Sequence, residues 1–147
     1  VPARYWIDLD TGTAGSEFFD DIHGEFCRVN DDRTGVRTDC LYMSGFTRPD
    51  PRGGDFDTVV KYDTRTDTRS RWYAGDQANI GECVFAPDPN GSAEDDGWII
   101  TSAHDSGTDT SEVLVLDARD IESGPIARAQ IPQRMPFGFH ANWFSAS

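Results

Sequence analysis

The chain has 147 residues and a formal net charge of −13, with 13 Lys and Arg against 26 Asp and Glu. This balance disfavours nucleic acid as a partner, because binding to a phosphate backbone needs clustered Lys and Arg. No stretch approaches the roughly 20 apolar residues of a membrane-spanning helix. The length predicts one domain with a core of its own.

The acidity comes mostly from aspartate, and Lys61 is the only lysine. A salt-adapted proteome and a GC-rich genome with a solvated acidic surface would both produce this bias, and the sequence leaves both open. Cys27, Cys40 and Cys83 are odd in number, which excludes a complete disulfide framework within the chain. We therefore expect reduced thiols in a cytoplasmic protein. The chain starts at Val1 rather than Met, so we expect a piece of a longer protein, and the lack of a signal peptide is uninformative.

Short strands separated by turns fill the chain, and no stretch has the periodicity of an amphipathic helix. Aromatic and β-branched residues mark the strands, and Asp, Gly and Pro mark the turns. We predict strands, in chain order, at residues 5–12 (running into a turn), 16–19, 23–30, 39–46, 58–63, 69–74, 82–87, 98–103, 112–117 and 126–131. Residues 47–56 and 87–96 are predicted loops. Residues 8–12 resemble the start of a calcium loop but lack its later acidic ligands, which favours a hairpin turn.

Two series of residues repeat along the chain with a common period. One is an aspartate that ends a strand, at Asp8, Asp63 and Asp117, with separations of 55 and 54. The other is an ionisable residue on a strand that looks buried, at Glu25, Glu82 and His140, with separations of 57 and 58. A period near fifty with about four short strands per repeat is typical of β-propeller blades. The spacing therefore predicts an all-β fold of propeller type.

The last dozen residues hold His140 between aromatic residues, after two prolines and a glycine that restrict the backbone. The run by itself fits either a core histidine with a satisfied hydrogen bond or a metal ligand held by an aromatic wall. On an innermost propeller strand, His140 would point at the same axis as Glu25 and Glu82.

Four stretches, in order, resemble the carotenoid cleavage oxygenases, a family that includes stilbene-cleaving and retinoid-isomerising members. They are Glu25-Phe26-Cys27-Arg28, Gly81-Glu82-Cys83-Val84-Phe85, Glu94-Asp95-Asp96-Gly97-Trp98 running into residues 114–119, and Pro136-Phe137-Gly138-Phe139-His140 followed by Asn142-Trp143. The resemblance implies a seven-bladed propeller several times longer than this chain. Residues 1–147 would then supply its C-terminal part, roughly two and a half blades.

The resemblance also assigns roles around the axis. It implies one non-haem iron(II) held by four histidines, with dioxygen as co-substrate, and His140 matches the last of the four. Glu25 and Glu82 match positions that accept hydrogen bonds from the ring N–H groups of ligand histidines, which fixes the tautomer. The alternative for each glutamate is a structural ion pair. Strand alternation would place Arg28 on the face opposite Glu25, which argues against a local pair and leaves a more distant arginine open.

Several other positions are candidates or departures. Phe85, Phe137 and Phe139 are candidate residues of a substrate tunnel, with ordinary blade packing as the alternative. Cys27 and Cys83 stand where the family usually has proline, and we expect them to fill space as small apolar residues. His23 and His104 match no ligand position and are expected to be solvated.

The activity implied is the oxidative cleavage of a carbon–carbon double bond in a carotenoid, apocarotenoid or stilbene-like substrate, giving carbonyl products. The complete protein would be the enzyme, and we expect the 147 residues alone to be inactive, because three ligand histidines are missing from them. A non-catalytic propeller binding module and an iron-dependent double-bond isomerase are the alternatives. Contact with a membrane surface through the missing part and the oligomeric state stay open.

Overall fold

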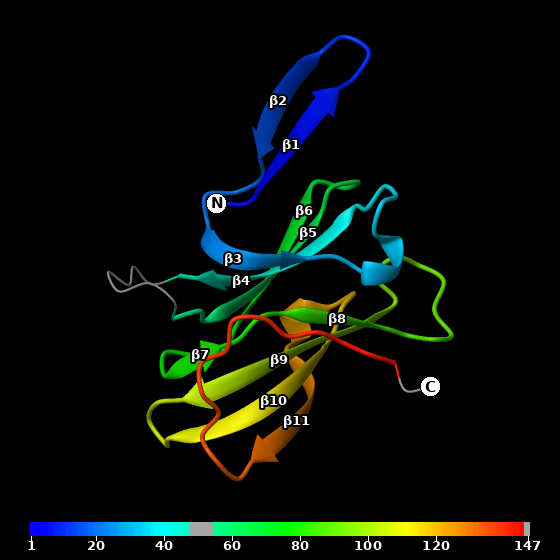
Figure 1. Cartoon of the computed structure of the whole chain (residues 1–147). Helices are drawn as coiled ribbons and strands as arrows, with labels where there is room; N and C mark the ends of the chain where they lie inside the picture. Colours follow the sequence, from blue (N-terminus) through cyan, green and yellow to red (C-terminus); the bar gives the residue numbers. More distant parts are fainter. Residues whose placement is uncertain (48–54, 146–147) are drawn as a thin grey trace.

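The computed structural model describes residues 1–47 and 55–145. Its strands form three antiparallel sheets, and the described residues contain no α-helix, only the short 3-10 turns η1 (Asp31–Arg33) and η2 (Ile121–Ser123). Accordingly, no helix in the described ranges is long and apolar enough to span a membrane. Figure 1 shows the sheets following one another along the chain, with the first hairpin standing apart from two larger sheets.

The first sheet is a hairpin of β1 (Ala3–Asp8) and β2 (Thr13–Phe18). The second sheet has the order β3-β4-β5-β6. Its strands are β3 (His23–Arg28), β4 (Cys40–Phe46), β5 (Thr58–Asp63) and β6 (Thr68–Tyr73). Each strand pairs with the next in the chain, as in a propeller blade. The predicted loop at 47–56 lies largely outside the described residues.

The third sheet has the order β11-β10-β9-β7, and β8 also pairs with β9. Its strands are β7 (Ala78–Ile80), β8 (Val84–Pro87), β9 (Gly97–Asp105), β10 (Thr110–Asp117) and β11 (Pro125–Ile131). The inner edge is therefore divided between two short strands, where the sequence predicted only one, at 82–87. The three residues between β7 and β8 include Glu82.

The aspartates of the first repeating series do end strands β1, β5 and β10. Each makes the same local contact, since its Oδ1 accepts a hydrogen bond from the backbone N–H two residues on, at 2.9 Å. A carboxylate that caps its own turn in this way is a common reason for Asp at the end of a strand. The hairpin turns after β1 and β5 each also contain one residue with positive φ, Gly12 (68°) and Asp67 (52°).

The main core lies between the two larger sheets. Tyr42 and Val59 from the second sheet meet Phe85, Ile99 and further apolar residues of the third, all nearly excluded from solvent. The rings of Tyr42 and Phe85 stack with centroids 5.6 Å apart. Burial of this apolar surface fixes how the two sheets pack face to face.

A buried carboxylate adds a polar contact between the same two sheets. The side chain of Glu94, in the loop that precedes β9, is only 6% exposed. Its Oε1 accepts hydrogen bonds from the backbone N–H groups of Asp39 and Cys40, each at 2.8 Å. Lys61 on β5 reaches the neighbouring Asp95 with Nζ–Oδ2 at 2.7 Å. The loop of one blade is thus bonded to the strands of the blade before it.

Residues 132–145, called the tail below, have no regular secondary structure. The tail leaves β11 and crosses the molecule past β7 and β8 (Figure 1). The prediction that His140 sits on an innermost strand is therefore wrong for this chain. A strand is defined by a hydrogen-bonded partner, and the tail crosses the described strands without pairing with any of them.

Candidate functional site

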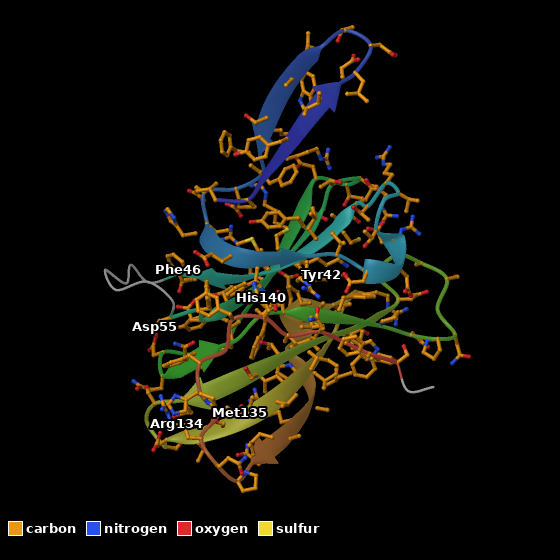
Figure 2. The ribbon with its side chains drawn as sticks, in the orientation of Figure 1. Tyr42, Phe46, Asp55, Arg134, Met135 and His140 are labelled. Carbon is orange, nitrogen blue, oxygen red and sulfur yellow. The ribbon has the colours of Figure 1, made fainter. Side chains whose placement is uncertain are left out.

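Glu82 and His140 come together at the centre of the molecule. Oε1 of Glu82 lies 3.5 Å from Nδ1 of His140, and Oε2 accepts a hydrogen bond from the backbone N–H of Ala141 at 2.5 Å. The Glu82 side chain is only 3% exposed, whereas that of His140 is 70% exposed. Figure 2 shows His140 on the tail between the two larger sheets. With Nδ1 turned toward the carboxylate, the Nε2 atom is the one left for a ligand.

Glu82 lies in the break between β7 and β8, where its side chain contacts the tail. The N–H of Gly81 donates to the carbonyl oxygen of Ser102 at 2.8 Å, and its own carbonyl accepts from the Ser44 hydroxyl at 2.7 Å. A Cβ at residue 81 would stand 2.5 Å from the Ser102 hydroxyl oxygen. A larger residue at position 81 would therefore require the Ser102 side chain to move.

A β-bulge on β3 changes which residues share a face. Glu25 is opposite Ser44 and Arg28 is opposite Tyr42, so three steps on β3 match two on β4. Ser44 and Tyr42 are two residues apart and point the same way, so their partners Glu25 and Arg28 also share one face. The prediction that Arg28 lies opposite Glu25 is wrong, because regular alternation does not hold through the bulge.

The bulge contains Phe26, which has a φ of 59°, in the left-handed region that non-glycine residues rarely enter. Its ring packs edge-on against His140, with centroids 5.6 Å apart, and against Phe56 at 5.4 Å. Strained backbone of this kind is typical of functional sites. Phe26 had no role in the sequence-based prediction, which assigned function only to its neighbour Glu25.

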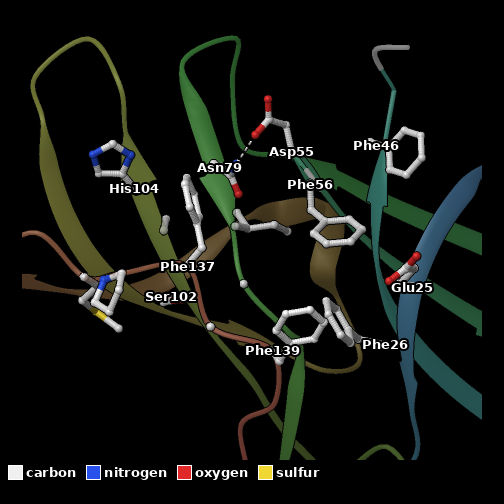
Figure 3. Close-up of a pocket in the computed structure, with 16 residues that line it drawn as sticks. Glu25, Phe26, Phe46, Asp55, Phe56, Asn79, Ser102, His104, Phe137 and Phe139 are labelled. Carbon is white, nitrogen blue, oxygen red and sulfur yellow. Dashed lines mark hydrogen bonds between the residues drawn. The ribbon is translucent and has the colours of Figure 1, made fainter. Parts of the chain in front are cut away.

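Glu25 itself is exposed and lines a cavity of about 460 Å³ beside the tail. Aromatic and apolar side chains dominate its wall, among them Phe26, Phe56, Phe137 and Phe139 (Figure 3). Phe137 and Phe139 line this cavity but are 66% and 78% exposed, and their role in a substrate tunnel stays a prediction. Phe85 is not part of this wall and is buried in the core against Tyr42.

His104 also lines the cavity, and its side chain is only 13% exposed, so the expectation that it is solvated is wrong. Its Nε2 lies 2.9 Å from Oδ1 of Asp109 in the β9–β10 turn. The ring of His104 meets Phe137 edge-on with centroids 6.4 Å apart, and the Arg134 guanidinium lies over the Phe137 ring, 5.5 Å from its centroid. His23 is exposed and stacks on Phe46. The buried positions of β9 are Gly97, Ile99, Thr101 and Ala103, so alternation places His104 on the less buried face and could not have signalled its place in the cavity wall.

The cysteines are free thiols. Cys40 and Cys83 are fully buried, and burial raises the pKa of Cys40 to about 11 and that of Cys83 to about 12. The Cys83 sulfur lies 3.3 Å from the Ser44 hydroxyl oxygen. Both thiols are therefore neutral near pH 7 and pack as small apolar groups, while Cys27 is exposed.

One imidazole with a carboxylate behind its Nδ1 is a suitable single ligand for a transition metal. Among the residues that the structure describes, no group of three or more His, Cys, Asp and Glu side chains could hold a metal ion. His140 therefore offers one imidazole nitrogen to a metal ion, and the described part of the chain supplies no complete coordination sphere.

The architecture and this site together define a class of protein, an all-β partial propeller with a carboxylate-backed histidine near the axis. A family model described as retinal pigment epithelial membrane protein matches residues 2–145. The chain belongs to this family, the carotenoid cleavage oxygenases.

Curated relatives and solved structures agree with this assignment. A carotenoid cleavage oxygenase of Mycobacterium tuberculosis is 36% identical over 143 residues, covering 95% of this chain and 28% of the relative. Lignostilbene-alpha,beta-dioxygenase isozyme III of Sphingomonas paucimobilis is 37% identical over 102 residues, covering 69% of this chain and 21% of the relative. A crystal structure of cobalt-substituted Synechocystis apocarotenoid oxygenase superposes with a TM-score of 0.90 at 26% identity, over 98% of this chain and 30% of that one.

These matches confirm the predicted family and the predicted fold, the blades of a partial β-propeller. The chain spans only about 28% of the length of the relative from Mycobacterium tuberculosis. The half blade is β1–β2, and the two complete blades are the second and third sheets.

Proposed function

We propose that this chain is the C-terminal part of a non-haem iron(II) dioxygenase that cleaves a carbon–carbon double bond of a carotenoid, apocarotenoid or stilbene-like substrate to carbonyl products. The observation that carries the proposal is the Glu82–His140 pair beside an aromatic cavity, with the carboxylate oxygen 3.5 Å from Nδ1. Family membership supports the reaction class, and the names of the relatives support the substrate class.

In this proposal His140 binds iron(II) through Nε2, and the other three histidines come from outside these 147 residues. Bound iron(II) supplies the redox chemistry that activates dioxygen. Glu82 holds the imidazole, because a carboxylate at Nδ1 keeps the ring proton on that nitrogen and leaves Nε2 unprotonated. Phe26 limits rotation of the ring by packing on it edge-on.

The cavity walls would bind the apolar part of the substrate. Phe137 and Phe139 belong to the same tail as His140, so the metal ligand and the aromatic wall are positioned by one segment. An aromatic wall suits a flat conjugated alkene, which loses little entropy when it is stacked.

The test uses the complete protein produced from the full reading frame. We expect stoichiometric iron and the conversion of an apocarotenal or a hydroxystilbene to two carbonyl products with uptake of dioxygen. The His140→Ala variant should lose both iron and activity. Rearranged alkene without oxygen uptake would instead indicate an isomerase, and iron-free protein that binds the alkene unchanged would indicate a binding module. Full iron occupancy in His140→Ala would refute the assigned ligand.

We also propose that the 147 residues alone are inactive and that the complete protein is cytoplasmic. One histidine ligand cannot retain iron against solvent and buffer. The free thiols are consistent with a reducing compartment. Iron analysis of the purified 147-residue chain and fractionation of the source cells test these two statements separately.

A further inference from the structure

We propose that Arg28 is a positioning residue of the metal site, which holds both Glu82 and the tail so that His140 is correctly oriented. The inference rests on the proposed role of His140 as an iron ligand. It concerns a residue that does not line the cavity.

The guanidinium of Arg28 contacts two side chains, those of Glu82 and Asn142. Its Nη1 lies 3.4 Å from Oε1 of Glu82, and its Nη2 donates to Oδ1 of Asn142 at 2.9 Å. The second nitrogen also lies 3.4 Å from Asp31, whose side chain is 65% exposed and adds little for that reason. One guanidinium thus joins the inner edge of the third sheet to the tail two residues beyond the histidine.

The bulge on β3 is the reason why Arg28 can reach these partners. If β3 alternated regularly through these residues, Arg28 would lie on the face opposite Glu25, and the bulge instead places the two on one face. The left-handed backbone at Phe26, φ 59°, is part of the same irregularity. Phe26, which packs on His140, and Arg28, which contacts the Glu82 carboxylate, therefore both owe their positions to the same bulge.

The Glu82 carboxylate has both oxygens engaged. Oε1 faces Arg28 and His140, and Oε2 accepts from the Ala141 N–H. A carboxylate that is 3% exposed needs a cation or several donors to remain in place. Arg28 provides the cation, and its planar fork fixes the direction from which Oε1 can approach the imidazole. Lysine has the charge but cannot span Glu82 and Asn142 with a planar pair of donors.

The experiment measures metal binding by the complete protein with cobalt(II) as the probe, since cobalt affinity and the visible d–d spectrum report the ligand set without any turnover. We compare Arg28→Lys, Arg28→Met and Asn142→Ala. Arg128→Lys is the control, because Arg128 on the edge strand β11 forms its ion pair with Glu112 on β10 rather than with Glu82 or Asn142. Thermal melting of each variant accompanies the titration.

We expect Arg28→Met and Arg28→Lys to weaken cobalt binding about tenfold or more and to shift the visible spectrum. Asn142→Ala should weaken cobalt binding less than the Arg28 variants do. The double variant of Asn142→Ala and Arg28→Met should lose less cobalt-binding free energy than the sum of the two single losses, because both changes remove the same Arg28–Asn142 contact. Arg128→Lys should bind as the unmodified protein does. Arg28→Lys and Asn142→Ala decide the question if Arg28→Met does not fold.

Unchanged affinity and an unchanged spectrum in folded Arg28→Lys and Asn142→Ala would overturn the role of Arg28. If the unmodified protein and His140→Ala bind cobalt equally strongly, the proposed function itself is overturned, because His140 is then not a metal ligand. The two failures are therefore distinguished by the His140→Ala titration alone.

Discussion

The carboxylate of Glu82 lies 3.5 Å from Nδ1 of His140, although the two residues belong to different parts of the chain, one in a break between strands and one on the tail. β7 ends before Glu82 and β8 begins after it, so Glu82 lies outside both strands, although the neighbouring Gly81 N–H still bonds to the Ser102 carbonyl of β9. The site therefore depends on an interruption of the sheet.

The first prediction concerns Glu82→Gln in the complete protein. Glutamine keeps the size of the side chain but loses the charge that pairs with Arg28 and holds the Nδ1 proton. We expect iron affinity or cleavage rate to fall on the order of 10- to 100-fold, without the complete loss expected for His140→Ala. Iron analysis and alkene-cleavage assays measure this, and Glu122→Gln, at an exposed position on η2, is the control. Equal losses in both glutamine variants would show that the effect does not come from the site.

The second prediction concerns the buried Glu94, which joins two blades. Glu94→Ala removes the acceptor of two buried backbone N–H groups, and we expect a loss of roughly 2 to 4 kcal/mol in the free energy of unfolding. Glu94→Gln should lose much less, because its amide oxygen can still accept both bonds. Denaturant unfolding of the complete protein gives the numbers, with Glu122→Ala expected to stay within about 0.5 kcal/mol. A small effect of Glu94→Ala would mean that water replaces the carboxylate.

The third prediction concerns the 147 residues on their own. Tyr5, Ile7, Leu9 and Phe18 on the first hairpin are between 66% and 91% exposed. Exposed apolar surface beside unpaired strand edges promotes association. We expect aggregation or a broad, weakly cooperative thermal transition, checked by size-exclusion chromatography and calorimetry. A soluble monomer with a sharp melting transition would contradict this.

The fourth prediction concerns the thiols. Burial raises the pKa of Cys83 to about 12 and that of Cys40 to about 11, so both stay protonated at pH 8 in the folded state. We expect iodoacetamide to label Cys27 first, and the other two only after unfolding. Above about pH 9 the thiols of the unfolded chain lose their protons, whereas the buried thiols of the folded chain keep theirs. The free energy of unfolding should therefore fall as pH rises from about 9 toward these pKa values. Peptide mapping by mass spectrometry and melting curves between pH 7 and 11 test both statements. Rapid native labelling of Cys83 would show that the core opens locally.

The sequence predicted those features that depend on local chemistry. Asp8, Asp63 and Asp117 end strands because each carboxylate caps its own turn, and this local contact repeats wherever the motif repeats. The period near fifty then predicts blades. The family resemblance assigned Glu25 and Glu82 to the support of ligand histidines and His140 to the metal, without saying which histidine each glutamate contacts, and these roles stay predictions.

The features that the sequence did not reveal depend on contacts between blades. The bulge at Phe26 cannot be inferred from alternation, and it moved Arg28 onto the face of Glu25. His140 looked like a strand residue because its neighbours are apolar, yet those neighbours face the cavity rather than a sheet. Phe85 was a candidate tunnel residue with core packing as the alternative, and it lies in the core.

The division of the molecule into sheets has a consequence for the order of folding. In both larger sheets nearly all hydrogen bonds join strands that are neighbours in the chain, so each blade can form by short loop closures, which are fast. The contacts of Arg28 with Glu82 and of Glu82 with Ala141 instead span 54 and 59 residues. They cannot form until two finished blades have docked and the tail has been laid across them. A chain that has completed its sheets but not this docking step would have all its secondary structure and no capacity to capture a metal ion. Far-ultraviolet dichroism would therefore recover before metal binding when the complete protein refolds.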